Sequence, residues 1–265
     1  MSKTLLPPRM QDVATQALRK VPEVTIYFWI VKLLTTAMGE STSDYLVYHI
    51  DPYVAVALGG VGLLASLVLQ LAVRRYVAWI YWLAVVMVAI FGTMAADVMH
   101  VVLGIPYLVS TVFFLIVLAI IFSAWYASER TLSIHSINTR RRELFYWAAV
   151  MATFALGTAA GDLTAATLNL GYFSSGLLFA VLFAAPGLAR WLLGLNGIAA
   201  FWFAYIMTRP LGASFADWFG KSSFGGLGLG DAWVVLVLTI LIVGFVAYLT
   251  VTRKDIKEDQ RQSSS

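Results

Sequence analysis

The sequence predicts an all-α polytopic membrane protein with about eight transmembrane helices in four parallel two-helix repeats. Two observations predict this fold class: a composition too apolar for a soluble domain, and a residue pattern that recurs four times. Of the 265 residues, 60% are hydrophobic and 12% are charged, and the mean hydropathy is +0.82. Because soluble domains carry about 25% charged residues, we expect the lipid bilayer to surround this chain.

Eight segments are long and apolar enough to cross a bilayer as helices. A membrane-spanning helix needs about 20 mostly apolar residues, and segments of that kind recur at even spacing along the chain. They lie at 24–46, 53–73, 76–101, 105–127, 144–167, 172–194, 196–218 and 232–252. The chain then divides into a first four-helix half at 1–127, a basic loop at 128–143, a second four-helix half at 144–252 and a polar tail at 253–265.

An internal repeat is the strongest signal in the sequence. Each odd-numbered segment contains a tryptophan, a glycine ten residues later and an aspartate five residues after the glycine. The four sets are Trp29, Gly39 and Asp44; Trp82, Gly92 and Asp97; Trp147, Gly157 and Asp162; Trp202, Gly212 and Asp217. All odd segments start on the same side of the membrane, so the repeats are parallel. Since small residues let helices approach closely in lipid, we expect the odd segments to form a central bundle.

Basic residues gather on one side of the predicted membrane. They precede the first segment, follow the second, fourth and sixth, and end the chain, as Arg9, Lys20, Lys257 and Arg261 illustrate. The loops on the other side contain only Lys221 as a basic residue. Because loops rich in lysine and arginine stay in the cytoplasm, we expect both termini to be cytoplasmic, and nucleic-acid binding is a poor interpretation of the net charge.

The four repeat aspartates are expected at one level of the bundle, towards its outer half. They are Asp44, Asp97, Asp162 and Asp217. An ionised carboxylate at membrane depth costs roughly 2.5–3.5 kcal/mol, so such residues normally face a cavity, a partner or an ion. One interpretation is a cation site on the repeat axis. The other is that each carboxylate caps a neighbouring helix or meets interfacial water.

One helical turn before the aspartates, three repeats carry another side chain with oxygen, namely Glu40, Thr93 and Thr158. Residues four apart share a helix face, so these oxygens would form a second layer beneath the carboxylates. Hard oxygen ligands suit manganese, magnesium or calcium. His100 follows an aspartate by three residues and would bias the site towards a transition metal. A histidine at a membrane interface can equally be a satisfied polar residue.

Two cations break the symmetry of the repeats. Lys32 and Arg209 lie inside the first and seventh segments, away from the predicted helix ends. Ionisable residues within a membrane are functional hypotheses by default, so both are candidates for coupling or for an ion pair. We expect Glu40 to pair with Lys32 and one of the repeat aspartates to pair with Arg209; a purely structural pair is the alternative.

The sequence contains the segments VPEVTIYFWIVKLLTTAMGESTSDYL and SIHSINTRRRELFYW and the GT-A-GD pattern of the fifth helix, and the likeness that they carry covers nearly the whole chain. They resemble a bacterial family of repeat membrane proteins, described mainly as membrane-anchored and of unknown function. The resemblance implies an eight-helix repeat architecture in a bacterial inner membrane, and no substrate. The fourth repeat departs most from the pattern, because Ala213 and its neighbours replace the small polar run.

Three functions remain open from the sequence. The first is a secondary transporter, an exporter being one form of it, that moves a divalent metal cation (manganese-like) or another cation and couples it to protons through the aspartates. The second is a non-transporting sensor or assembly subunit with structural carboxylates, docking through 128–143. The third is an intramembrane enzyme or organic-ligand-binding protein. Because no recognisable catalytic or nucleotide-binding motif is present, we expect no enzyme and no resident cofactor. A homo-oligomer is compatible with the sequence.

Overall fold

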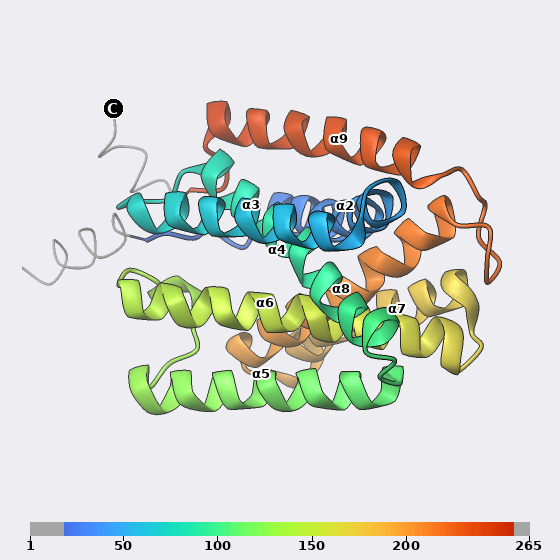
Figure 1. Ribbon diagram of the computed structural model, residues 1–265. Helices are drawn as coiled ribbons and strands as arrows, with labels where there is room; N and C mark the ends of the chain where they lie inside the picture. The colour runs from blue at the N-terminus through green and yellow to red at the C-terminus, as the bar shows by residue number, and fades with distance from the viewer. Residues whose placement is uncertain (1–18, 257–265) are drawn as a thin grey trace, which may run out of the picture.

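The computed structural model describes residues 19–256 and shows eight long α-helices in that range (Figure 1). They are α2 (Ile26–His49), α3 (Pro52–Ala72), α4 (Ala78–Asp97), α5 (Tyr107–Glu129), α6 (Arg140–Asp162), α7 (Gly171–Leu193), α8 (Gly197–Gly220) and α9 (Asp231–Thr252). Each predicted segment corresponds to one helix, within a few residues at its ends. Arg9, Lys257 and Arg261 lie outside the described residues, as does most of the tail at 253–265.

The helices have the lengths and surfaces of membrane spans. Six of those described, all except α2 and α8, are long and apolar enough to cross a bilayer. α2 and α8 have 24 residues each and are less apolar because they carry charged side chains inside the bundle, which are Lys32, Glu40, Asp44, Arg209 and Asp217. The outer helices expose large aliphatic side chains such as Val68 on α3 and Ile120 on α5. Lipid solvates such surfaces, so the chain is a polytopic all-α membrane protein.

The inner helices form a closed ring. α2, α4, α6 and α8 contact one another in cyclic order, which confirms the expectation that the odd segments form the central bundle. Each outer helix packs mainly on the inner helix of the next repeat: α3 on α4, α5 on α6 and α7 on α8. The last outer helix, α9, packs on α2 of the first repeat. The repeats therefore interlock around a common axis, and the chain closes the circle on itself.

The repeat glycines create the close contacts within this ring. A methyl group added to any of them would overlap an atom of the next inner helix. The four contacts are Gly39 with Ala89, Gly92 with Phe154, Gly157 with Arg209 and Gly212 with Thr36. The contacted residues all stand seven positions after the repeat tryptophan. The same close contact between neighbouring inner helices thus recurs four times, as expected for small residues at helix interfaces in lipid.

The basic loop is shorter than the sequence analysis predicted. α5 continues to Glu129 and α6 begins at Arg140, so the first three arginines of α6 belong to a helix and not to a loop. Thr139 accounts for the early start, because its hydroxyl oxygen accepts a hydrogen bond from the Arg142 backbone N–H at 3.3 Å. A threonine cap satisfies one of the free donors at a helix start. Only a short 3₁₀ turn, Ile134–Ser136, lies between the two helices.

A buried polar network closes the bundle at the end where the α5–α6 connection and the end of α9 lie (Figure 1). Lys20, counted above as a loop cation, is only 6% exposed. Its ammonium group lies 2.5 Å from Glu143 on α6, and Gln70 on α3 donates to the same carboxylate at 3.1 Å. Nearby, burial and Asp255 raise the pKa of Tyr76 well above its ordinary value. The segment before α2 is therefore tied to α3 and α6, and its Glu23 backbone N–H also donates to the Asp255 carbonyl at 2.9 Å.

Candidate cation site

One arginine fills the layer beneath the aspartates. Arg209 on α8 is fully buried, and its Nη2 lies within hydrogen-bond distance of side-chain oxygens of Glu40 on α2, Thr93 on α4 and Thr158 on α6. All three predicted oxygen ligands of the second layer thus face one point. The guanidinium group lies at that point, where we had expected an external ion. Arg209 also donates to the Thr36 backbone carbonyl at 3.3 Å, so a single side chain connects the four inner helices.

The predicted ion pairs of Lys32 and Arg209 are wrong. Glu40 pairs with Arg209 and not with Lys32, because the closed ring brings α8 directly against α2. Lys32 is 1% exposed, and within residues 19–256 its ammonium group makes no hydrogen bond. It lies 3.8 Å from the centre of the Phe154 ring and 4.3 Å from that of Tyr205. Aromatic faces attract a desolvated cation by up to about 2 kcal/mol each.

Two of the four aspartates form what we call the lysine-bridged pair. Lys221, just after α8, places its ammonium nitrogen 2.8 Å from a carboxylate oxygen of Asp44 and 2.8 Å from one of Asp217. Burial of Lys221 favours its neutral form, but Asp217 and Asp44 outweigh burial and raise its pKa well above the ordinary value. The only basic residue of the predicted outer loops is therefore a fixed, charged partner of two repeat aspartates.

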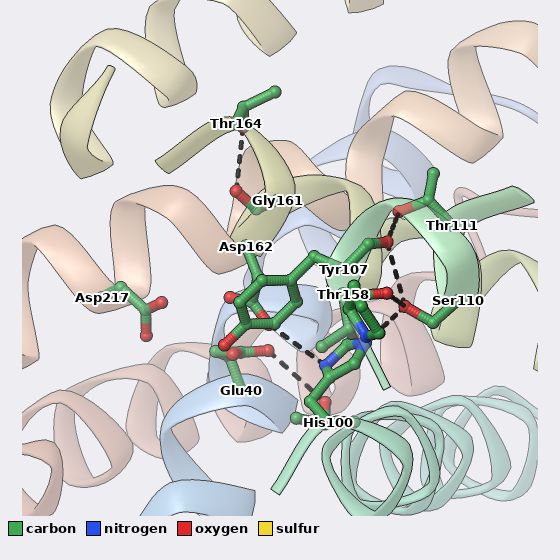
Figure 2. Close-up of polar contacts among 12 residues, drawn as sticks. Glu40, His100, Tyr107, Ser110, Thr111, Thr158, Gly161, Asp162, Thr164 and Asp217 are labelled. Carbon is green, nitrogen blue, oxygen red and sulfur yellow. Dashed lines mark hydrogen bonds and ion pairs between the residues drawn. The ribbon is translucent and has the colours of Figure 1, made fainter. Parts of the chain in front are cut away.

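The other two aspartates form a histidine cluster with His100, which we define as Asp97, His100 and Asp162. Oxygen and nitrogen atoms of the three side chains lie within 4.8 Å of one another. His100 Nδ1 is 3.9 Å from Asp162 Oδ2, and Nε2 is 2.5 Å from Ser110 Oγ on α5 (Figure 2). Among residues 19–256, no lysine or arginine forms an ion pair with Asp97 or Asp162.

The backbone also differs between the two pairs. After Asp97 and after Asp162 the α-helix widens into a π-helix of five residues, at Val98–Val102 and at Leu163–Thr167. After Asp44 and before Lys221 the helices stay α-helical to their ends. π-Helical turns are rare in proteins, and those that occur are often found at functional sites. In this chain, the first of them contains His100, and the wider turn is therefore part of what positions this ring beside the carboxylates.

Exposure differs between the carboxylates of the site, and the Asp217 side chain is only 4% exposed. The side chains of Asp162 and Asp44 are 22% and 14% exposed, whereas that of Glu40 is 4% and that of Arg209 is 0%. In the view of Figure 2, Glu40 lies between Asp217 and His100. A third acidic group, Glu40, also has an oxygen within 4.8 Å of those of Asp44 and Asp217.

Sequence reasoning missed Lys221 and Ser110. Lys221 follows Asp217 by four residues, a spacing that places two helical side chains side by side, so its contact could have been found. No comparable signal exists for Ser110, which is ten residues from His100 and on another helix. The sequence correctly placed Thr93 and Thr158 on the axis. In the structure, however, their hydroxyl oxygens lie against Arg209 and not around an ion.

The fold and the acidic groups define a class: a repeat membrane protein, with eight long helices in residues 19–256 and ionisable residues on its axis. A family profile described as Repeat of Unknown Function (DUF347) matches the chain four times, at residues 27–76, 80–131, 145–194 and 200–255. The chain belongs to this family, as the resemblance implied. No curated protein and no solved structure proved similar to it.

Proposed function

We propose that this protein is a secondary transporter of a divalent metal cation, manganese-like in its preference for oxygen ligands, or of another small cation. The observation that supports the proposal is the histidine cluster. It brings two carboxylates, the last residues of α4 and α6, within 4.8 Å of each other without a lysine or arginine partner among residues 19–256. Such a pair is costly unless a cation or a proton neutralises it. A carboxylate pair that exchanges protons for a cation is the simplest proton-coupled site.

The distribution of polarity along the axis suits one state of an alternating-access cycle. Asp44 and Asp162 are partly exposed, whereas Asp217, Arg209 and Lys32 are buried. The opposite end is closed by Lys20 and Glu143. A cation could reach the carboxylates from one side only in this state, and transport requires a second state in which the closed end opens.

We place the aspartate end outside and both termini in the cytoplasm of a bacterial inner membrane. The basic residues on the side of Arg142 and Arg253 favour that orientation. Reporter fusions at the two termini and after Ser136 should give cytoplasmic signals, and a fusion after Ser223 should give an external one. A cytoplasmic signal from the α8–α9 connection would reverse the proposed direction of access.

The rival function is a sensor or assembly subunit without transport, and one observation favours it. Glu40, Asp44 and Asp217 already have cationic partners within the protein, namely Arg209 and Lys221. Those three acidic groups can hold the bundle together without any external ion. The rivalry therefore concerns the remaining two carboxylates, Asp97 and Asp162.

An organic-ligand site is the third candidate. An apolar cavity of about 770 Å³ lies between α2, α8 and α9, lined among others by Leu34, Phe215, Trp233 and Leu238. It contains none of the ionisable residues of the axis. A lipid chain or an apolar molecule would suit its walls better than a metal ion.

Flux into proteoliposomes separates these functions. We expect the purified protein to move Mn²⁺, or another member of a panel of small cations, with an opposing movement of protons. Asp97→Asn and Asp162→Asn should abolish the flux, while the matched variant Asp51→Asn should not, because Asp51 caps α3 outside the ring. Absence of flux for every cation tested, from protein shown to be folded, would favour the sensor or assembly subunit.

A further inference from the structure

We propose that the histidine cluster is a transition-metal site in which His100 Nδ1 is a ligand and Ser110 holds the ring in the binding tautomer. This inference deepens the proposed function, on which it rests for the identification of Asp97 and Asp162 as cation ligands. It also narrows the bound cation to a transition metal, since a nitrogen ligand favours Mn²⁺, Co²⁺ or Zn²⁺ over Mg²⁺ and Ca²⁺.

The position of the His100 proton follows from Ser110. A serine hydroxyl has one proton to donate, and Ser110 Oγ lies 3.0 Å from the Tyr107 backbone carbonyl, one helical turn earlier. Helical serines commonly donate to such a carbonyl. With the serine proton used in this way, the oxygen of Ser110 is the acceptor in its 2.5 Å contact with His100 Nε2, and we assign the ring proton to Nε2.

That tautomer leaves the lone pair of Nδ1 facing the aspartates. The His100 side chain is only 4% exposed, and Nδ1 makes no hydrogen bond within residues 19–256. Its nearest charged neighbour is Asp162 Oδ2 at 3.9 Å. A lone pair directed at a carboxylate is unfavourable in a buried site unless something positive lies between them.

A metal ion between these atoms resolves the conflict. The bonds of Zn²⁺ to nitrogen and oxygen are about 2.0–2.2 Å long, so two ligand atoms of one ion lie at most about 4.4 Å apart. The separation of 3.9 Å between His100 Nδ1 and Asp162 Oδ2 is within that limit. Three protein ligands leave coordination positions open for water, as an ion that must enter and leave requires.

Ser110 has the role that outer partners have in other metal sites. Histidines that bind metals donate their second ring N–H to a fixed acceptor, and loss of that acceptor typically lowers metal affinity by 10–100-fold. Ser110 is fully buried and lies on α5, whereas the ligands lie on α4 with its π-helical extension and on α6. α5 packs on α6, so the packing of an outer helix would set the affinity of the axial site.

The test is equilibrium binding to the purified full chain in detergent, freed of metal with a chelator. Mn²⁺, Zn²⁺, Mg²⁺ and Ca²⁺ are titrated separately, and electron paramagnetic resonance records whether bound Mn²⁺ couples to a nitrogen. We expect binding of the transition metals with a nitrogen signal. His100→Gln should remove that signal, and Ser110→Ala should weaken Mn²⁺ binding by about 10–100-fold while keeping it.

Two controls keep this test decisive. His49→Gln should change nothing, because His49 is exposed and its Nδ1 already contacts the Tyr45 carbonyl at 2.8 Å. If His100→Gln does not fold, the smaller change Ser110→Ala carries the test. Mn²⁺ bound without a nitrogen signal, Mg²⁺ bound as tightly as Mn²⁺, or no metal bound would each overturn the inference. Binding as expected without flux would overturn transport but not the metal site.

Discussion

The lysine-bridged pair and the histidine cluster come from the same duplicated pattern, yet they differ in what neutralises them. Asp44 and Asp217 share Lys221, a cation supplied by the chain itself. Asp97 and Asp162 lie close to each other and to His100, and neither has a lysine or arginine partner among residues 19–256. The first pair lies on α2 and α8, which stay α-helical, and the second is followed by π-helical turns.

The difference shows how one repeat can serve two purposes. Repeated carboxylates on an axis repel one another, and repulsion rises as water is removed. Lys221 and Arg209 relieve that repulsion on one side of the ring, at Asp44, Asp217 and Glu40. The remaining two carboxylates are then the ones free to take up an external cation. Substitutions on the two sides should therefore behave differently, first in stability and then in ion response.

The largest loss of stability is expected at the most buried ion pair, between Glu40 and Arg209. Glu40→Gln leaves the buried guanidinium of Arg209 without its counter-ion, and breaking such a pair costs about 3–5 kcal/mol. Chemical denaturation in detergent should show this loss. Thr158→Val is the matched control, because it removes only one hydrogen bond to a charged group, worth about 1.5–3 kcal/mol. An equal loss in both variants would mean that Arg209 depends on the layer as a whole and not on Glu40.

A smaller effect is expected for Lys221→Met, since this lysine is about a quarter exposed. Loss of its contacts with two carboxylates should lower the free energy of unfolding by about 1–3 kcal/mol. Because Asp44 and Asp217 would then lack their bridging cation, added Mn²⁺ or Ca²⁺ should restore most of that loss. A variant that divalent ions do not rescue would contradict the view that Lys221 occupies a cation position. Lys254→Met, at the exposed end of α9, is the control.

The smallest effect on stability is expected in the histidine cluster. Asp97→Asn keeps the size of the side chain and removes one of two like charges, so in metal-free buffer the free energy of unfolding should change by less than about 1 kcal/mol or rise. Thermal unfolding of Asp97→Asn and Asp162→Asn measures this. A loss of several kcal/mol in both would show that these carboxylates are structural, as the sensor or assembly hypothesis requires.

The sequence predicted the ring but not the identity of all its partners. The fixed spacing of Trp29, Gly39 and Asp44 in four copies sufficed to predict the inner helices and the glycine contacts between them. It could not reveal that Arg209 meets Glu40, because that contact exists only where α8 returns to α2 and closes the circle. Local spacing records which residues share a helix face, and not which helices become neighbours.

The histidine cluster illustrates the same limit. His100 follows Asp97 by three residues, so their proximity was expected. Its lateral support from Ser110 and its distance to Asp162 depend on the packing of α5 and α6 and on the π-helical turn. A helix-period argument assumes α-helical geometry, and a wider turn changes the direction of each side chain after it.

The most direct measurement of the difference between the two pairs is Mn²⁺-dependent thermal stabilisation of four variants, measured side by side with the unaltered protein. Stabilisation by a bound ion depends on its concentration relative to the dissociation constant. Asp97→Asn and Asp162→Asn should lose most of the upward shift in Tm. Asp44→Asn and Asp217→Asn should keep it, with a lower starting Tm. If the second set loses the shift and the first keeps it, the assignment of the external cation to the histidine cluster is wrong.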